Sequence, residues 1–365
     1  MTNIENQWFN ALTKDRTDSA ITLEKPSMRG VKRSVVDKYS DQAHFVYELL
    51  QNADDVKASS AHFSLEADAL SFIHNGQIRF TVSDPQNEEA DTKSGTLGHI
   101  NAITSIANSN KTQASIGKFG VGFKAVFQYT QTPHIYDPSV RFKIERFIVP
   151  HLLDSDHDGR KASETVFCFP FDHTMKSKPE SHDEIVGKLK ALEFPILFLS
   201  SLKSVSFAAV NVSGKYTKDV TRKVEQDDVT VRWLTLTLEL NGEKNAHRLL
   251  LLTRNSKAGL PISIGYALGD DDRIEPIQRT AFCFFPTKEA TNLNFILHAP
   301  FLLTDSREGI KAGEVHNREL IQELSILAAD SLPILRDEKL IDDGIFDIIP
   351  YDESEMPLII GPKAI

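Results

Sequence analysis

The sequence predicts an α+β protein of two domains. The chain has 365 residues, which is long for a single domain. Residues 41–55 carry apolar side chains at the spacing of a helix with one buried face. After about residue 205, a run of strand-like segments is followed by one long helical segment at 317–335. Strands followed by a helix are typical of an α+β domain.

In the first half, residues 1–40 are expected to form an N-terminal arm with a short helix near Trp8–Leu12. The polar, turn-rich residues 83–95 predict a loop. Strands are expected at 61–65, 70–74, 140–149 and 164–171, and helices at 99–107, from 121 onward and at 181–194, the last with Ser181 as its start signal.

The second half is expected to begin with alternating and apolar strands and to end with a helix. Asn317 is the expected N-cap of the helix at 317–335. The predicted domains are 1–204, 205–336 and an acidic segment at 337–365. The expected strands are 205–210, 229–240, 247–254, 262–268 and 279–286.

Composition excludes several classes of protein. The net charge of −10 (41 minus 51) does not suit a chain built as a whole to coat nucleic acid or an anionic membrane. Cys168 and Cys283 lie in apolar runs, which predicts two buried thiols in strands rather than a disulfide framework or a metal site. Two such thiols favour a protein of the reducing cytoplasm. No signal peptide or membrane-spanning segment is expected.

Three polar residues form one stripe on the helix at 41–55. Glu48, Asn52 and Asp55 fall within about 60° of one another at 100° per residue. Two carboxylates and an amide in a row are able to supply a base, a metal ligand and a hydrogen-bond partner. Taken alone, such a stripe is typical of a solvated face. Asp54 is expected to face solvent.

Residues 115–127, "SIGKFGVGFKAVF", form a glycine-rich segment that we call the glycine loop. Its glycines allow the backbone to approach a ligand closely, and the helix expected to follow offers free N–H groups to an anion. Lys118 and Lys124 add positive charge. The chain contains no G-x-x-x-x-G-K-[ST] phosphate loop, and a glycine-rich turn by itself is a weak signal.

A third segment, "LLTDSREGI" at 302–310, holds Arg307 in a loop after an apolar strand. An arginine in such a loop is able to bind a phosphate with two hydrogen bonds. A plain surface Arg–Glu pair explains the same residues when the segment is judged alone.

Together, these three segments resemble the Hsp90-like (GHKL) ATPase superfamily. "DQAHFVYELLQNADD" and "FIHNG" are most similar to its sacsin and NO VEIN branch. The resemblance covers about residues 30–335. It implies a GHKL (Bergerat) α/β two-layer sandwich with a mixed sheet, followed by a smaller middle or transducer-like α+β domain.

The resemblance also implies roles. Glu48 stands where the family has the general base, Asn52 where it has the Mg²⁺ ligand, and Asp55 near the ribose and adenine. Arg307 is expected to sense the γ-phosphate. The phosphate contacts are expected from Ser109, Asn110, Lys111, Gly117, Lys118, Gly120, Val121, Gly122, Phe123 and Lys124.

One departure from the family pattern concerns the base contact. His74 stands where the family has the aspartate that binds the adenine amino group, and Asn75 and Gly76 follow it. The Asn75 amide is expected to supply an acceptor for that amine instead.

The implied function is Mg²⁺-dependent binding and slow hydrolysis of ATP in a chaperone-like or defence-associated machine. Residues 95–124 are expected to form a lid that closes over the nucleotide. The implied ligands are ATP or ADP and Mg²⁺. The implied partners are another protein, further domains of a longer chain, or a second copy of the chain. A nucleotide-binding scaffold or sensor without hydrolysis is the alternative, and a DNA-acting ATPase clamp is a further one, which the net charge of −10 does not support.

Overall fold

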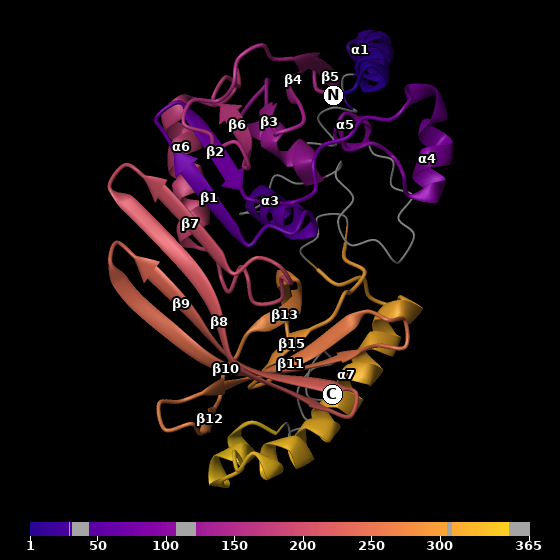
Figure 1. The fold of residues 1–365 in the computed structure, drawn as a ribbon. Coiled ribbons are helices and arrows are strands. Elements are labelled where there is room, and N and C mark those ends of the chain that lie inside the picture. The colour runs from indigo at the N-terminus through magenta and orange to yellow at the C-terminus, as the bar shows by residue number, and fades with distance from the viewer. Residues whose placement is uncertain (29, 31–43, 107–121, 305–308, 350–365) are drawn as a thin grey trace. The chain divides into compact units, whose positions relative to one another are not determined.

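The computed structural model describes residues 1–28, 30, 44–106, 122–304 and 309–349. Two compact units are present (Figure 1). The first comprises Met1–Leu192 and Ser200–Gly214, and the second comprises Glu193–Leu199 and Lys215–Ile365. The chain therefore changes unit three times. The predicted domain boundary at 204/205 stays a prediction.

The first unit contains a mixed sheet in the order β7-β1-β2-β6-β3-β4-β5. The β1 and β7 strands run parallel, and the other neighbours are antiparallel. The strands are β1 (Ser60–Leu65), β2 (Ala69–His74), β3 (His134–Tyr136), β4 (Arg141–Glu145), β5 (Val149–Leu152), β6 (Thr165–Pro170) and β7 (Ser204–Ala209).

One row of aromatic and apolar side chains crosses this sheet on its core face. Side chains alternate between the two faces of a strand, so residues paired across neighbouring strands share a face. The register joins Phe207, Phe63, Phe72, Phe167, Ile135 and Phe142 in that order, and each is at most 2% exposed. His74 lies two residues after Phe72 and therefore on the same core face.

The helices and 3₁₀ turns of the first unit include the helix that carries the polar stripe. They are α1 (Asn3–Leu23), η1 (Pro26–Met28), α3 (His44–Asp55), η2 (Pro85–Asn87), α4 (Glu88–Ser94), α5 (His99–Ile103), η3 (Gly122–Gln128) and α6 (Lys178–Lys190). The α3 helix places Val46, Leu49 and Ala53 in the core, each at most 1% exposed. The helix predicted from apolar periodicity is thereby confirmed.

Two polar segments of the first unit are more helical than predicted. The α1 helix has 21 residues and starts with a capping box between Thr2 and Glu5, so the short helix at Trp8–Leu12 was an underestimate. The α4 helix lies inside the predicted loop 83–95. Arg16 of α1 is 8% exposed and pairs with Glu88 of α4, and this contact between distant segments leaves no local pattern in the sequence.

Within the second unit the strands follow the order β8-β9-β10-β11-β15-β13-β14, with β12 beside β11. The β13 and β15 strands run parallel. Its elements are β8 (Val212–Gln226), β9 (Val229–Leu240), β10 (Glu243–Asn255), β11 (Pro261–Leu268), β12 (Ile274–Glu275), β13 (Thr280–Cys283), β14 (Phe285–Ala290), β15 (Ile296–His298), α7 (Val315–Asp337) and η4 (Asp343–Asp347). The α+β class and the large mixed sheet are confirmed.

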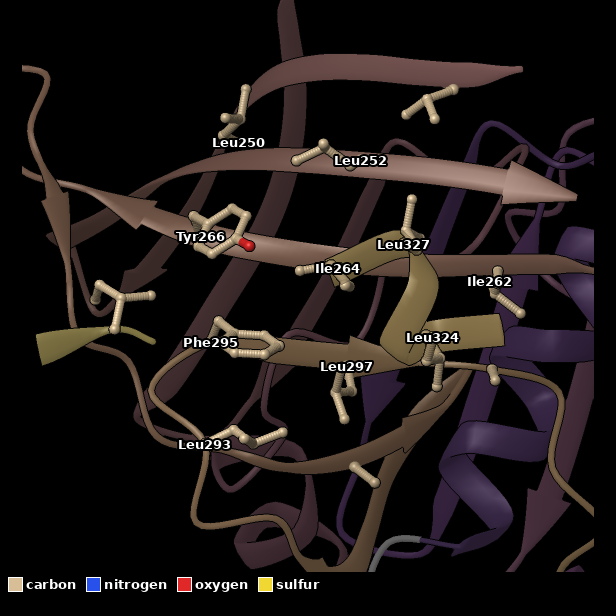
Figure 2. Close-up of a cluster of buried hydrophobic side chains, with 14 of the residues drawn as sticks. Leu250, Leu252, Ile262, Ile264, Tyr266, Leu293, Phe295, Leu297, Leu324 and Leu327 are labelled. Carbon is tan, nitrogen blue, oxygen red and sulfur yellow. The ribbon is translucent and has the colours of Figure 1, made fainter. Parts of the chain in front are cut away.

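The α7 helix packs over β10, β11 and β15 and closes the core of the second unit. Figure 2 shows Leu324 and Leu327 of α7 facing Ile264 of β11 and Leu297 of β15, and all four are at most 1% exposed. The predicted helix at 317–335 is confirmed, but its N-cap is Glu314 rather than Asn317.

Asn317 instead closes the loop that precedes α7. Its side-chain oxygen accepts a hydrogen bond from Leu302 N at 2.7 Å, and its amide nitrogen donates to Leu302 O and Lys311 O, each at 2.9 Å. The base of the loop that contains Arg307 is therefore fixed by one buried asparagine. Arg307 itself lies outside the described residues.

Two further predictions concern a helix start and the cysteines. The α6 helix begins after Ser177, whose side chain accepts from Glu180 N, rather than at Ser181. Cys168 of β6 and Cys283 of β13 are free thiols in strands and are only partly buried. In the part of the chain that the structure describes, no helix combines the length and the apolar character needed to cross a membrane.

Candidate functional site

Two of the three residues in the polar stripe of α3 are buried rather than solvated, and Asp55 is partly buried. Glu48 is 9% exposed and Asn52 is 5% exposed. The two side chains stand one helical turn apart, while the apolar face of the same helix packs into the core. Charged and amide side chains are mostly exposed in proteins, so two of them buried one turn apart make this stripe a candidate site rather than a solvated face.

The Glu48 carboxylate lies directly against Gly122, the first described residue of the glycine loop. A Cβ atom placed on Gly122 would lie 1.9 Å from Glu48 Oε2 and 2.1 Å from Glu48 Cδ. No side chain fits in that space, so glycine is required at 122 for as long as Glu48 keeps this position. The fold thus brings α3 and Gly122 together, although they are far apart in the sequence.

Replacing Gly122 with alanine is expected to push the Glu48 carboxylate out of place. The end of a glutamate side chain is able to move, so we expect the fold to survive with a loss of about 1–3 kcal/mol. A displacement of this size is expected to lower the rate of a reaction that uses Glu48 by about 100-fold. Thermal unfolding and the nucleotide hydrolysis proposed below measure the two effects.

Gly187→Ala is the matched control for this prediction. Gly187 lies in α6, and a Cβ there meets no atom within 4 Å. Alanine in a helix interior is more favourable than glycine by about 0.5–1 kcal/mol, so this variant should be slightly stabilised with an unchanged rate. Equal rates for Gly122→Ala and the unmodified protein would show that the Glu48 position does not matter.

Asp55 sits at the end of the same helix with an unsatisfied oxygen. Its Oδ2 atom is buried and has no hydrogen-bond partner among the described residues. Burial raises the pKa of this carboxyl to about 7, and the negative charge of Asp54 adds to the effect. An orphaned buried carboxyl oxygen fits a site that is completed by a ligand or a proton.

Asp54 is not solvent-facing, contrary to the prediction. It is 8% exposed, and its carboxylate accepts hydrogen bonds from the backbone N–H groups of Ser200, Ser201 and Leu202. Its partners lie about 150 residues away in the sequence, so no local pattern indicates this role.

His74 is buried on the core face of β2 and is uncharged at neutral pH. Its Nδ1 atom accepts a hydrogen bond from Gly76 N at 3.1 Å. Burial lowers the pKa of His74 to about 4, against the opposing charge of Asp137. Since Nδ1 accepts, the proton of the neutral ring lies on Nε2. Gly76 is close-packed as well, because a Cβ there would lie 2.5 Å from Val56 Cγ2.

The Asn75 amide is engaged by the backbone at the start of β1. Its oxygen accepts from Ser59 N at 2.9 Å and Ser60 N at 3.0 Å, and its nitrogen donates to Ser59 Oγ. Both lone pairs of that oxygen are therefore used. In this arrangement the Asn75 oxygen is not available to accept from an adenine amine.

Lys124 and Phe123 also serve the core. Lys124 is 0% exposed, its Nζ donates to Phe147 O at 2.9 Å, and it lies 4.8 Å from the Phe147 ring centroid. Phe123 packs against Phe167 and Phe169 of β6. The ammonium group of Lys124 thus contacts a carbonyl and an aromatic face and points into the core.

Two residues near His74 were not predicted from the sequence. The Asp137 carboxylate, 1% exposed, accepts hydrogen bonds from Thr165 Oγ1, Ser139 N and Phe80 N. Arg79 has a buried Nη1 atom without a hydrogen-bond partner in the described part of the chain. The only sequence signal for Arg79 was a cation three residues after the turn at Gly76.

The remaining predicted contacts lie outside the described residues. They are Ser109, Asn110, Lys111, Gly117, Lys118, Gly120, Val121 and Arg307. Among the residues that are described, no three histidine, cysteine or acidic side chains are grouped as a metal site. A Mg²⁺ ion held by one asparagine oxygen needs no such group, because Mg²⁺ keeps most of its waters and binds substrate phosphates.

Comparison with known proteins places the chain. The family model of the Sacsin domain matches residues 27–144. The protein NO VEIN of Arabidopsis thaliana is 25% identical over 336 residues, which cover 80% of this chain and 11% of NO VEIN. The chain is sacsin-like and NO VEIN-like. The predicted resemblance to sacsin and NO VEIN is thereby confirmed.

The sacsin-like match contains the buried stripe and its surroundings. Residues 27–144 include α3, the β1–β2 pair with the His74 turn, and η3 with Gly122. The chain spans about a tenth of the length of NO VEIN, so its activity within a whole protein belongs to the proposal that follows.

Proposed function

We propose that the first unit binds a Mg²⁺–nucleoside triphosphate, ATP by its resemblance to the Hsp90-like ATPases, and hydrolyses it slowly. The observation that carries this proposal is the contact between Glu48 and Gly122. It joins the carboxylate that resembles the family's base to the loop that resembles the family's phosphate-binding glycines. A scaffold has no need of an acidic group at that position.

The residues of the proposed site have separate tasks. Glu48 takes the proton of the attacking water, and its burial beside Gly122 fixes where that water stands. Asn52 is the protein ligand of Mg²⁺, which neutralises charge on the phosphates when bound. Asp55, with its orphaned Oδ2, faces the nucleoside. Backbone N–H groups of the glycine loop bind the phosphates, and Arg307 meets the γ-phosphate.

At the level of the whole protein, we propose a chaperone-like or defence-associated machine of the cytoplasm. Closure of a lid formed by residues 95–124 would change the affinity of the chain for a protein partner, a further domain or a second copy of the chain. The sacsin-like match supports this reading over a DNA-acting clamp, as does the net charge of −10.

Isothermal titration with ATP and with GTP, each with and without Mg²⁺, tests the proposal. We expect Mg²⁺-dependent binding of ATP, and slow release of phosphate in a separate assay. Binding without hydrolysis would instead assign the scaffold or sensor function. Failure to bind either nucleotide would overturn the central claim.

The Asn52→Ala variant tests the metal assignment within the same titration. Removing the amide oxygen takes away the protein ligand of Mg²⁺, so the affinity gained on adding Mg²⁺ should fall by about 10- to 100-fold. Affinity measured without Mg²⁺ should stay the same. An unchanged Mg²⁺ dependence would show that the ion is held by other groups.

A further inference from the structure

Asp54 connects α3 to a segment distant in the sequence. Its Oδ2 accepts from Ser200 N at 2.9 Å and from Ser200 Oγ at 3.0 Å. Its Oδ1 accepts from Ser201 N at 2.6 Å and from Leu202 N at 2.8 Å. Hydrogen bonds to an ionised acceptor are about twice as strong as neutral ones, so this carboxylate binds the three consecutive residues 200–202 firmly.

Residues 200–202 lie where the chain returns from the second unit to the first. Residues 193–199 belong to the second unit, and the chain returns to the first unit at Ser200. Asp54 therefore holds the first three residues after that return. We call residues 200–202 the crossover. The hydrogen bonds that Asp54 accepts from it lie within the first unit, and the covalent chain at 199–200 continues from it into the second unit.

On the other side of the crossover, residues 193–199 are firmly held within the second unit. The Phe198 ring stacks on His298 with centroids 4.2 Å apart and meets Phe282 at 5.2 Å. The Nζ atom of Lys218 donates to Ile196 O at 2.8 Å and also bonds to Leu199 O. A movement of the crossover would therefore displace residues 193–199, which are packed, rather than a loosely held segment.

On the site side, Asp54 belongs to the same rigid helix as the stripe. Asn52 lies two residues before it and Glu48 six residues before it, so Glu48 is about 9 Å away along the helix axis. Asp55, whose Oδ2 has no described partner, is its direct neighbour. A ligand that binds Asn52 or Asp55 contacts the same helical turn that carries Asp54. Asp54 in turn is hydrogen-bonded to the crossover.

We propose that Asp54 is the residue that couples occupancy of the α3 site to the second unit, through the crossover at 200–202. The proposal rests on the nucleotide function proposed above. Asp54 is a positioning residue: it touches neither nucleotide nor metal, and it acts by tying α3 to residues 200–202.

Hydrogen–deuterium exchange of the full chain, with and without Mg²⁺–ATP, tests the coupling once titration has shown binding. In the unmodified protein, nucleotide should slow exchange in α3 and also change exchange in residues 193–199 by about fivefold or more. In Asp54→Asn, which keeps the shape but loses the charge and one acceptor, the change in α3 should remain and the change in 193–199 should disappear. The nucleotide Kd should stay within about threefold.

Asp172→Asn is the matched control. Its carboxylate also accepts a backbone N–H, from Gln131, and two hydroxyls, from Thr130 and Thr132, none of which lies on α3 or in the crossover. This variant should keep both changes in exchange. Melting temperatures of both variants show whether either has simply lost stability, which would raise exchange everywhere rather than in 193–199 alone.

Two results would overturn the coupling while leaving nucleotide binding intact. One is an unmodified protein whose residues 193–199 do not respond to nucleotide. The other is an Asp54→Asn variant that responds in full. A chain that binds no nucleotide in the titration would overturn the proposed function, and the coupling with it.

Discussion

Replacing Glu48 with glutamine is expected to lower the rate of nucleotide hydrolysis by about 10²- to 10⁴-fold and to leave nucleotide affinity within about threefold. The glutamine side chain has the same shape and fits the same space against Gly122, where the carboxylate now lies. It is unable to accept the proton of a water molecule. Steady-state phosphate release and titration calorimetry measure the two quantities on one preparation.

The Glu48→Ala variant gives a second test of the same role. It removes the base together with its packing against Gly122, so it should also abolish hydrolysis while binding persists. Glu66→Gln is a suitable control, because Glu66 is an exposed residue after β1 and should have no effect. If nucleotide binding vanished in both Glu48 variants, Glu48 would be a structural residue rather than a base.

Replacing Asp55 with asparagine is expected to stabilise the ligand-free protein at pH 8 and to have little effect near pH 4. The carboxyl pKa is raised from 3.8 to about 7 in the folded chain, chiefly by burial. Below pH 4 the carboxyl is protonated in both states and contributes nothing. As pH rises toward 7, the unfolded chain releases its proton while the folded chain keeps it, so folded stability falls.

The loss is complete and constant once the pH is well above 7. Asparagine does not ionise, so the stability difference between the variant and the unmodified protein should grow from pH 4 to pH 7 and then level off at about 2–4 kcal/mol. Urea unfolding at a series of pH values measures it. A difference independent of pH would show that Asp55 ionises normally.

His74 makes the comparison with the variant necessary. Burial lowers the pKa of His74 to about 4, so its contribution has the opposite sign: stability is lost as pH falls from 6.5 toward 4. The two groups therefore oppose each other in the stability curve of the unmodified protein. Because His74 is present in both proteins, subtracting one curve from the other isolates Asp55.

The sequence indicated the site through helical spacing and the glycine loop. Glu48 and Asn52 are one turn apart by the geometry of any helix, so their common face follows from the sequence alone. The strands at 61–65 and 70–74 were predicted for a similar reason, because alternation is a local property. The sacsin and NO VEIN resemblance also came from short segments, and the comparisons confirm it.

Where the sequence misled, a polar residue had a partner distant in the chain. Asn75 bonds to the start of β1 and Lys124 to Phe147, two contacts that the sequence did not indicate; their expected ligand contacts stay predictions. Asn317 was expected to cap a helix, and it closes the loop at 302–311 instead. A polar side chain satisfies its hydrogen bonds with whatever the fold brings near.

By itself, then, the sequence determined the α+β class, the resemblance to sacsin and NO VEIN and the residues of one helical stripe, because each depends on local periodicity or on short motifs. Only the tertiary structure decided that Glu48 and Asn52 are buried, that Glu48 lies against Gly122 and that Asp54 grips residues 200–202. Burial and hydrogen-bond partners depend on contacts between segments far apart in the chain, and no local pattern encodes those contacts.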